Sequence, residues 1–246
     1  MTSTPEAGFV SERGMFDQFL NVLEHSGLDL KQGSIAYASS SGAVYGGSSP
    51  PPFDETTEPV PLGLYGESKL WAERRLETFG RATSVPVFIG RVSNLYGPGQ
   101  NLLKRQGLIT ELCKSALLRR PISIFVPLDT TRDYLYVDDC ASLLIRSSQR
   151  LSELHGTGKL VQKVLASGRS STIAGVIGEF KQFSGRRPLI VTGRSTAAAL
   201  QSRDLRVAST VWRDLDSAAK TPLIAGIAST YADMLSRFQR PGRAVA

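Results

Sequence analysis

The stretch SIAYASSSGAVYGG, residues 34–47, decides the fold. It begins as a short buried strand over 34–38 and continues into Ser39, Ser40 and Ser41 and then a glycine-punctuated turn. Ligands of open α/β sheets bind outside the carboxyl ends of the strands. We therefore expect these three hydroxyls to lie at the edge of the sheet where a ligand would bind.

Strands alternate with helices along the rest of the chain. Helical spacing of apolar residues predicts helices over 13–26, 64–81, 106–118, 138–150, 172–184 and from Thr221 and Pro222 onward. Strands are predicted at 34–38, 85–92, 122–126, 160–166 and 188–192, and the proline-rich segment 46–63 is a loop. Ser171 is the expected N-cap of the helix over 172–184. This alternation predicts an α/β fold with a parallel sheet.

The composition is that of a soluble globular protein, with 246 residues of which 41% are hydrophobic and 21% charged. No apolar run is long enough to cross a bilayer, and the N-terminus shows no secretory signal. We therefore expect a cytoplasmic protein without a membrane partner. The net charge of +7 comes without a nucleic-acid-binding motif, so no nucleic-acid partner is expected. It reflects either a solvated basic surface or a field that favours an anionic ligand such as a diphosphate.

The cysteines and histidines carry no metal-binding pattern. Cys113 and Cys140 lie far apart without a CxxC spacing and are expected to be buried thiols. His25 and His155 lack the spacing of metal ligands, so no metal site is predicted.

A tyrosine and a lysine one turn apart open the helix over 64–81. On a helix, Tyr65 and Lys69 share a face. The ordinary pKa of a phenol is about 10, and a cation held nearby lowers it, so the pair is a plausible unit for proton transfer. A Ser hydroxyl from the upstream strand could hold a substrate oxygen beside it. The spacing alone also occurs by chance in many helices.

A second strand end is polar as well, since Ser93 and Asn94 follow the strand over 85–92. Structural roles are open for several of these residues. Ser39 and Ser40 could cap the turn, Asn94 could be a turn former, and Arg132 could pair with Asp133. Asp138 and Asp139 stand where a helix starts, so N-capping is their expected role.

Four motifs, taken together, resemble a known family. YASSSGAVYG (37–46), DETTEPVPLGLYGESK (54–69), RVSNLYGPGQN (91–101) and RDYLYVDD (132–139) resemble the extended short-chain dehydrogenase/reductases, specifically the NAD-dependent epimerase/dehydratase family that acts on nucleotide sugars. The resemblance covers about residues 13–240, and the nearest type is similar to UDP-glucose 4-epimerases. It implies NAD as the cofactor and a nucleotide sugar as the substrate.

The resemblance also implies roles for individual residues. Catalysis would rest on Ser41, Tyr65 and Lys69, and the cofactor-binding positions are Ser39, Tyr65, Lys69 and Ser93. Substrate-binding positions are Ser41, Asn94 and Arg132. An arginine suits a diphosphate because its planar fork grips two oxygens at once.

The two residues after Ser41 bear on the type of reaction. The resemblance implies an acidic pair there in sugar 4,6-dehydratases, whereas Gly42 and Ala43 can act neither as acid nor as base. This favours oxidation and reduction at a carbinol, as in an epimerase. Tyr65 would take the proton of the sugar hydroxyl, Ser41 would steady that oxygen, and hydride would pass to NAD and return to the other face.

A glycine-rich turn between a first strand and a first helix is the signature of a dinucleotide site, and none occurs in this sequence. We therefore expect a partial Rossmann-like parallel sheet without its first strands, over residues 1–150, and a small C-terminal α/β substrate-binding lobe over 151–246. One hypothesis is part of a nucleotide-sugar epimerase that is incomplete by itself. The alternatives are a pseudoenzyme or binding module without catalysis, and an NAD(P)-dependent reductase or dehydratase. A homodimer through the helix over 64–81 is a further expectation.

Overall fold

A parallel three-stranded sheet carries the serine-rich stretch along one of its edges. The strands lie in the order β1-β2-β6, and both pairs are parallel. Their bounds are Ile35–Ser40, Val87–Val92 and Leu160–Leu165. The computed structural model describes residues 6–102, 107–185, 188–193 and 202–239. The prediction of an α/β fold with a parallel sheet is confirmed.

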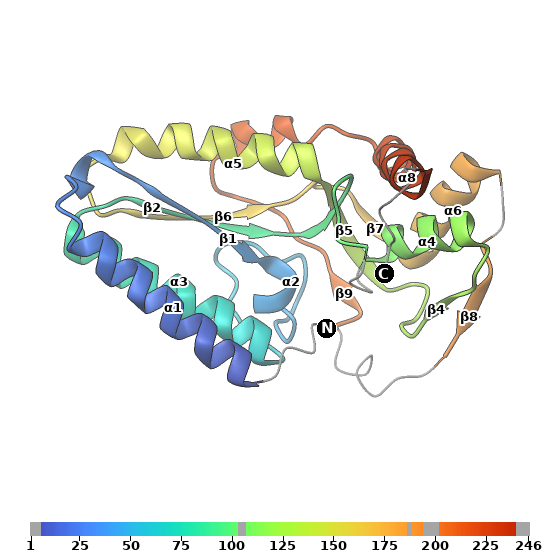
Figure 1. Cartoon of the computed structure of the whole chain (residues 1–246), viewed down its shortest axis with the longest axis horizontal. Coiled ribbons are helices and arrows are strands. Elements are labelled where there is room, and N and C mark those ends of the chain that lie inside the picture. The colour runs from blue at the N-terminus through green and yellow to red at the C-terminus, as the bar shows by residue number, and fades with distance from the viewer. Residues whose placement is uncertain (1–5, 103–106, 186–187, 194–201, 240–246) are drawn as a thin grey trace.

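Helices cover both faces of this sheet (Figure 1). On one face lie α1 (Glu6–Glu24) and α3 (Leu64–Thr83), which pack against each other. On the other face lies α5 (Val137–Leu151), which contacts β2 and β5. The buried residues of α3 include Ala72, Leu76 and Phe79, whose spacing of four and three puts them on one stripe of the helix. The sheet is therefore the middle layer of three.

The central strand β2 is buried along its whole length, as expected for a parallel strand with helices on both faces. Side chains on its two faces contribute to two different clusters. Ile89 packs with Leu20 of α1 and Leu76 of α3, while Phe88 packs with Leu143 of α5 and with Leu165 of β6. Arg91 is the one charged residue in this strand.

A second group of strands lies beyond the carboxyl end of the first sheet. In the order β3-β5-β7, β3 and β5 are parallel and β5 and β7 antiparallel, while β9 also pairs with β5. Strands β4 and β8 form a separate parallel pair. The bounds are Asn94–Tyr96 (β3), Ile122–Ile124 (β4), Thr131–Tyr136 (β5), Ser170–Thr172 (β7), Ile190–Thr192 (β8) and Asp204–Leu205 (β9).

Three helices pack together on this second group (Figure 1). They are α4 (Leu108–Leu118), α6 (Ile173–Ser184) and α8 (Leu223–Gln239). Leu112, Phe180 and Ile227, one from each helix, are fully buried in their shared core. The short elements are α2 (Ser41–Val44) and the 3-10 turns η1 (Leu30–Gln32), η2 (Ser152–Leu154) and η3 (Arg213–Ala218).

Both groups draw on both halves of the chain. Strand β6, from the second half, lies in the first sheet, while β3, α4 and β4, from the first half, belong to the second group. The division of the chain at residue 150 stays a prediction.

Two local predictions have different outcomes. The N-cap of α6 is Thr172 rather than Ser171, because Ser171 is paired with Arg132 in the β5–β7 ladder and the Thr172 hydroxyl accepts from the Gly175 amide at 3.0 Å. The prediction of buried thiols is confirmed, since Cys113 and Cys140 are both free and buried. Burial raises the pKa of Cys113 to about 12 and that of Cys140 to about 11.

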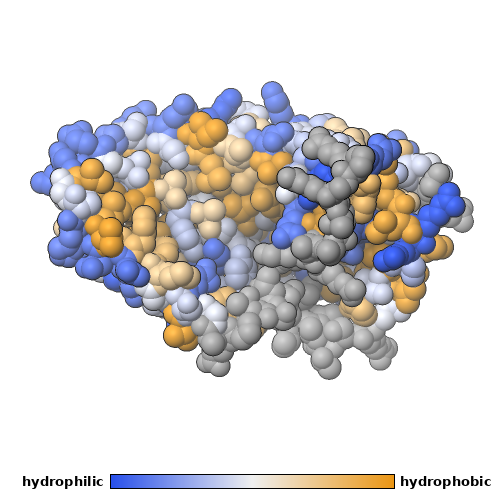
Figure 2. Space-filling model, in the orientation of Figure 1, coloured by the Kyte–Doolittle hydropathy of each residue, from blue (hydrophilic) through white to orange (hydrophobic). Residues whose placement is uncertain are grey.

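Hydrophobic and hydrophilic residues are interspersed over the face that Figure 2 shows, without one continuous apolar band. Among the helices of the described residues, none is both long and apolar enough to cross a membrane.

Candidate active site

The serine-rich stretch forms the end of β1 and the start of α2. Ser40 is the last residue of the strand and the N-cap of the short helix, and its Oγ accepts a hydrogen bond from the Ala43 amide at 3.4 Å. The expectation that Ser40 caps the turn is confirmed. Ser41 follows as the first helical residue and is 3% exposed. Its Oγ donates to the carbonyl of Val92, the last residue of β2, at 3.2 Å.

Tyr65 and Lys69 lie one turn apart at the start of α3. The Lys69 Nζ is 5.7 Å from the centre of the Tyr65 ring and 4.9 Å from the centre of the Tyr37 ring in β1. It donates to the Tyr37 hydroxyl at 3.1 Å and approaches the carbonyl of Ala38 at 3.5 Å. The ammonium is thus held between two phenols at the edge strand of the sheet.

Burial sets the pKa values of this pair. It raises the pKa of Tyr65; a side-chain hydrogen bond with Ser40 lowers it again, and the charge of Glu12 raises it further. Burial lowers the pKa of Lys69, against the charges of Glu12 and Glu73, which raise it. Tyr65 is therefore a neutral phenol, and to act as a base it needs its phenolate stabilised by a cation.

Gly66 brings the start of α3 close to α2. A Cβ on this residue would overlap the carbonyl oxygen of Ala43 and would lie 2.8 Å from the Cβ of Pro61. Glycine is therefore needed for the two helices to approach this closely. The approach places Tyr65 beside the serine-bearing turn.

A buried polar network lies behind the same face of α3. Glu73 is 4% exposed and Arg91 is 3% exposed, and their closest atoms, Oε2 and an Nη, are 2.6 Å apart. The hydroxyl of Ser39, also buried, donates to Glu73 Oε1 at 2.5 Å. The Ser39 hydroxyl is therefore engaged inside the protein in this structure. Its role in cofactor binding stays a prediction.

Asp133 holds the polar residues Ser93 and Asn94 that follow β2. Its carboxylate accepts from the Ser93 hydroxyl at 2.7 Å, and its carbonyl accepts from the Asn94 side chain at 2.9 Å. Asp133 does not pair with Arg132, so the local ion pair considered for them is wrong. The Arg132 guanidinium donates instead to the carbonyls of Thr131 at 2.8 Å and Ser202 at 2.7 Å.

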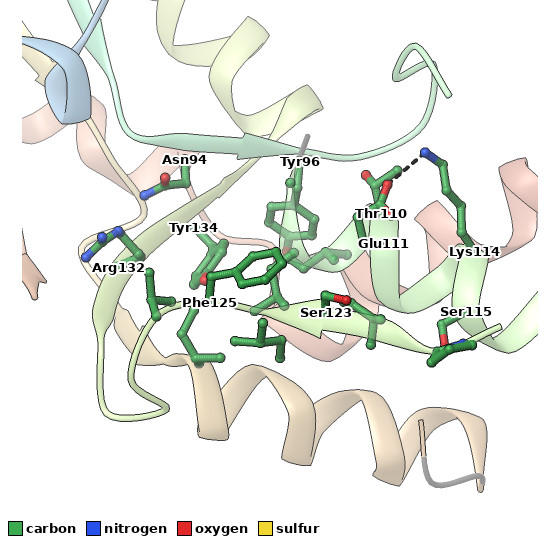
Figure 3. A pocket seen from close by; sticks show the side chains of 18 of the residues that line it. Asn94, Tyr96, Thr110, Glu111, Lys114, Ser115, Ser123, Phe125, Arg132 and Tyr134 are labelled. Atoms are coloured by element: carbon green, nitrogen blue, oxygen red, sulfur yellow. Dashed lines mark hydrogen bonds and ion pairs between the residues drawn. The ribbon is translucent and has the colours of Figure 1, made fainter. Parts of the chain in front are cut away.

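A cavity of about 890 Å³ opens beside β3 and β5. Because 94 pairs with 134 in parallel register, the side chains of Asn94, Tyr96, Arg132 and Tyr134 share one face of these strands, and all four line the cavity. Figure 3 shows Asn94 and Arg132 at one end, and the ion pair of Lys114 and Glu111, 2.8 Å apart, at the other. The aromatic side chains Tyr96, Phe125 and Tyr134 lie between the two ends.

A short stretch of backbone, from Val92 to Asn94, connects the cavity to the turn that carries Ser41. Ser41 is bonded to the carbonyl of Val92, and Asn94 stands two residues further along the chain. The cavity wall and the turn that carries Ser41 therefore come from neighbouring stretches of backbone. Arg132 places a positive charge in the cavity wall.

The family model described as NAD dependent epimerase/dehydratase family matches residues 4–158. The chain belongs to this family. Its curated relatives include a putative UDP-glucose 4-epimerase of Methanocaldococcus jannaschii, 35% identical over 127 residues, or 51% of this chain and 42% of the relative. They also include a dTDP-4-dehydro-6-deoxyglucose reductase of Escherichia coli, 35% identical over 105 residues, or 43% of this chain and 33% of the relative. The chain thus spans less than half the length of either relative.

Solved structures show the same fold. The UDP-glucose 4-epimerase of Thermotoga maritima, solved with UDP-glucose, superposes with a TM-score of 0.75 at 22% sequence identity, and the match covers 89% of this chain and 68% of that one. The epimerase/dehydratase chain described here therefore has the fold that the resemblance implies.

The structure adds three candidate residues that the sequence analysis does not name. The sequence predicts Tyr37 only as a strand residue, although its alternation with Ala36 and Ala38 places it on one face of β1. Glu73 and Arg91 carried a clearer signal. Arg91 interrupts an apolar strand, which calls for a buried partner, and Glu73 continues the four-residue spacing of Tyr65 and Lys69.

Asp139 also has a role other than the expected one. Its carboxylate accepts from the amide and the hydroxyl of Thr221 at 2.8 and 2.9 Å, while α5 has no side-chain cap. The expectation that it caps its own helix is wrong, because its carboxylate holds the start of α8 instead. Among the described residues, no cluster of His, Cys, Asp or Glu could hold a metal ion.

Proposed function

We propose that this chain forms the catalytic and substrate-binding part of an NAD-dependent nucleotide-sugar epimerase that resembles UDP-glucose 4-epimerases. One observation carries the proposal. Lys69 and Tyr65 share a face of α3 at the carboxyl end of β1, Ser41 there is bonded to Val92, and two residues after Val92 the chain enters the wall of a cavity that Asn94 and Arg132 line. A nucleotide sugar is proposed to extend from the cavity, with its anion-binding group, to the proton-transfer groups.

Tyr65 is the proposed acid and base. Its phenol is neutral in this structure and can donate a proton to a sugar oxygen; in the other direction, Lys69 stabilises the phenolate that accepts one. Ser41 steadies the same oxygen by turning its hydroxyl from the Val92 carbonyl toward the substrate. Gly42 and Ala43 supply no acid, which favours this reaction over dehydration.

The cavity is proposed to hold the nucleoside diphosphate. Arg132 is buried to 8% exposure, so its charge acts in an environment of low dielectric. The Asn94 amide lies at the same end of the cavity (Figure 3). The aromatic groups Tyr96, Phe125 and Tyr134 give the flat apolar surface that a nucleobase needs.

NAD fits the donor set beside the catalytic pair. The ammonium of Lys69 has one bond to Tyr37 and a longer approach to Ala38, and it suits ribose hydroxyls. Ser93 directly follows β2, the strand that pairs with β1. NAD would supply the acceptor and donor of hydride. Residues of this chain would orient the nicotinamide end, and we propose that further groups are needed for the adenosine end, since the sequence carries no glycine-rich turn.

A second candidate is a nucleotide-sugar-binding module without catalysis. It is favoured by the inward hydrogen bond of the buried Ser41 hydroxyl, which occupies the group that would steady the substrate. Both functions share the cavity and differ only in turnover.

Two further proposals accompany the function. A homodimer through α3 is supported by the exposed apolar residues on its neighbour α1, which include Met15 and Phe19. A cytoplasmic location is proposed from the sequence alone. Sedimentation equilibrium of the chain, compared with a Phe19→Glu variant, tests the dimer. A monomeric parent would overturn it.

Calorimetry with UDP-glucose, UDP and NAD tests the function. Binding of UDP-glucose should be weakened at least tenfold by Arg132→Ala, since a hydrogen bond to a charged group contributes roughly 1.5–3 kcal/mol. The matched control is Arg146→Ala on α5. Conversion of UDP-glucose in the presence of NAD, abolished by Tyr65→Phe with binding retained, supports the enzyme. Binding without turnover supports the module, and absence of UDP-sugar binding contradicts both.

A further inference from the structure

The buried hydrogen-bond network around Glu73 and Arg91 joins α3, β2, β1 and the C-cap of α2. Arg91 Nε lies 3.1 Å from Glu73 Oε1, and one Nη lies 2.6 Å from Oε2, so the two groups form a bidentate pair. The other Nη donates to the Tyr45 hydroxyl at 2.6 Å, which in turn donates to the carbonyl of Asp54. Ser39 donates to Glu73 from β1. The carboxylate and most of the guanidinium are therefore saturated.

Glu73 and Arg91 each lie close along the chain to candidate catalytic residues or their partners. Glu73 stands four residues after Lys69 and eight after Tyr65, on the same face of α3. Arg91 directly precedes Val92, whose carbonyl receives the bond from Ser41. The position of α3 against the sheet thus sets where the Tyr65 and Lys69 side chains reach.

Ser39 and Tyr45 tie in the turn between them. Ser39 comes two residues before Ser41, and Tyr45 is the C-cap of α2. Both ends of the serine-bearing segment are therefore connected to the same buried pair of charges. A shift of the pair would move the turn and the helix relative to each other.

We propose that Glu73 is a positioning residue whose carboxylate, clamped by Arg91 and Ser39, fixes the rotation and height of α3 so that Tyr65 and Lys69 meet the end of β1. The catalytic consequence rests on the proposed function, while the geometric one does not. A buried ion pair contributes little to stability when compared with apolar residues of similar size, because desolvation offsets the attraction. The pair instead fixes the orientation of α3 relative to β2, since a bidentate pair accepts one relative orientation of helix and strand.

The same helix provides a matched control. Glu77 is paired with Arg81 at 2.6 Å, but Arg81 is 74% exposed, and neither residue touches the candidate site. Glu77→Gln therefore removes a carboxylate from α3 without touching the network. Glu73→Gln keeps the shape of the side chain and removes its charge.

The experiment measures the proximity of Lys69 on α3 to Tyr37 on β1 by nuclear Overhauser contacts in the labelled 246-residue chain, with the contact to Tyr65 on the same helix as an internal reference. The parent and Glu77→Gln should show contacts from the Lys69 ε-methylene to the rings of Tyr37 and Tyr65. Glu73→Gln should lose the contact to Tyr37 of β1 and keep the contact to Tyr65, which lies on the same helix as Lys69, while the spectrum stays that of a folded protein. If the contacts are unchanged in folded Glu73→Gln, the proposal is overturned.

A second variant covers the case in which Glu73→Gln does not fold. The double variant Glu73→Met/Arg91→Met replaces the buried pair by apolar groups, a type of exchange that often preserves stability. Loss of the Lys69–Tyr37 contact in this folded variant supports the positioning role, and retention of the contact overturns it. Where turnover is measurable, kcat should fall at least tenfold while KM for the nucleotide sugar stays within twofold. Absence of nucleotide-sugar binding in the parent would count against the proposed function and leave the contact measurement intact.

Discussion

The ammonium of Lys69 donates a hydrogen bond to the hydroxyl of Tyr37 over 3.1 Å. The bond joins the first turns of α3 to the edge strand of the sheet. Tyr37 is itself held by an edge-on contact with Phe16 of α1, with ring centres 5.9 Å apart. Burial raises the pKa of Tyr37, so it is a neutral phenol at physiological pH and a permanent partner of the cation.

Removal of the Tyr37 hydroxyl should loosen Lys69. Tyr37→Phe keeps the ring and the cation–π contact but removes the hydrogen-bond acceptor, so we expect a loss of about 0.5–1.5 kcal/mol in the free energy of unfolding. Urea denaturation measures it. The control is Tyr231→Phe in α8, whose half-buried ring packs on Phe183 of α6. Equal effects of the two variants would contradict the role given to Tyr37.

Two glycines should respond to alanine with opposite signs. Gly66→Ala places a methyl group on the Ala43 carbonyl and should cost about 1–3 kcal/mol through overpacking. Gly178 lies on the exposed side of α6, where an added Cβ meets nothing within 4 Å, so Gly178→Ala should stabilise by about 0.5–1 kcal/mol. Thermal unfolding of both variants checks the signs. A neutral Gly66→Ala would mean that α2 and α3 need not approach closely.

The charge of Glu12 opposes ionisation of Tyr65. Burial is the larger cause of the raised pKa of Tyr65, and the nearby carboxylate adds to it. Glu12→Gln should therefore lower the pKa of Tyr65 and increase the phenolate fraction at a given pH. Carbon NMR of the tyrosine Cζ atoms, assigned with Tyr65→Phe, measures this shift. Glu24→Gln, at the other end of α1, should leave it unchanged, and an equal response in both variants would refute the assignment.

Acid should weaken the attachment of the loop over 46–63. Burial by itself raises the pKa of Glu55, but hydrogen bonds from Ser209, Thr210 and Val164 outweigh it and lower that pKa. A depressed folded-state pKa gives stability that is complete above the ordinary Glu value of about 4.3 and is lost as the pH falls toward the folded value.

Glu55→Gln should accordingly flatten the decline of unfolding free energy below pH ~4.3. Denaturation curves at several pH values check this. The comparison variant is Glu58→Gln in the same loop, which should retain the slope of the parent. A parent-like slope in Glu55→Gln would remove Glu55 as the acid-sensitive group.

The sequence predicted the regular elements because their patterns are local. Helix α3 was expected over 64–81 and lies at Leu64–Thr83, and β2 was expected over 85–92 and lies at Val87–Val92. The start of α1 was missed, since the helix was expected from residue 13 and begins at Glu6. Phe9 is buried about one turn before the predicted start, but the adjacent pair of Phe9 and Val10 in a polar segment carries no helical periodicity.

The candidate site was predictable where its residues are neighbours on one helix or strand end. Tyr65 and Lys69 share a helical face by spacing alone, and the structure brings Ser41 to the same sheet edge. The partners of Arg132 were not predictable, because the Ser202 carbonyl that it binds stands 70 positions away. For Glu73, the spacing behind Lys69 gives the helical face but not the partner, since a helical glutamate looks the same in sequence whether it faces water or an arginine of the next strand.

The two edges of the first sheet are finished differently. On β6, the outward amide of Val164 is bonded to the Glu55 carboxylate at 2.7 Å, so a side chain from the proline-rich loop takes the place of a neighbouring strand. On β1, the side chains of Ala36 and Ala38 are exposed, and the Lys69 ammonium approaches the carbonyl of Ala38 at 3.5 Å. A carboxylate thus meets one outer strand of the sheet and an ammonium meets the other, so the sheet carries opposite charges at its two sides.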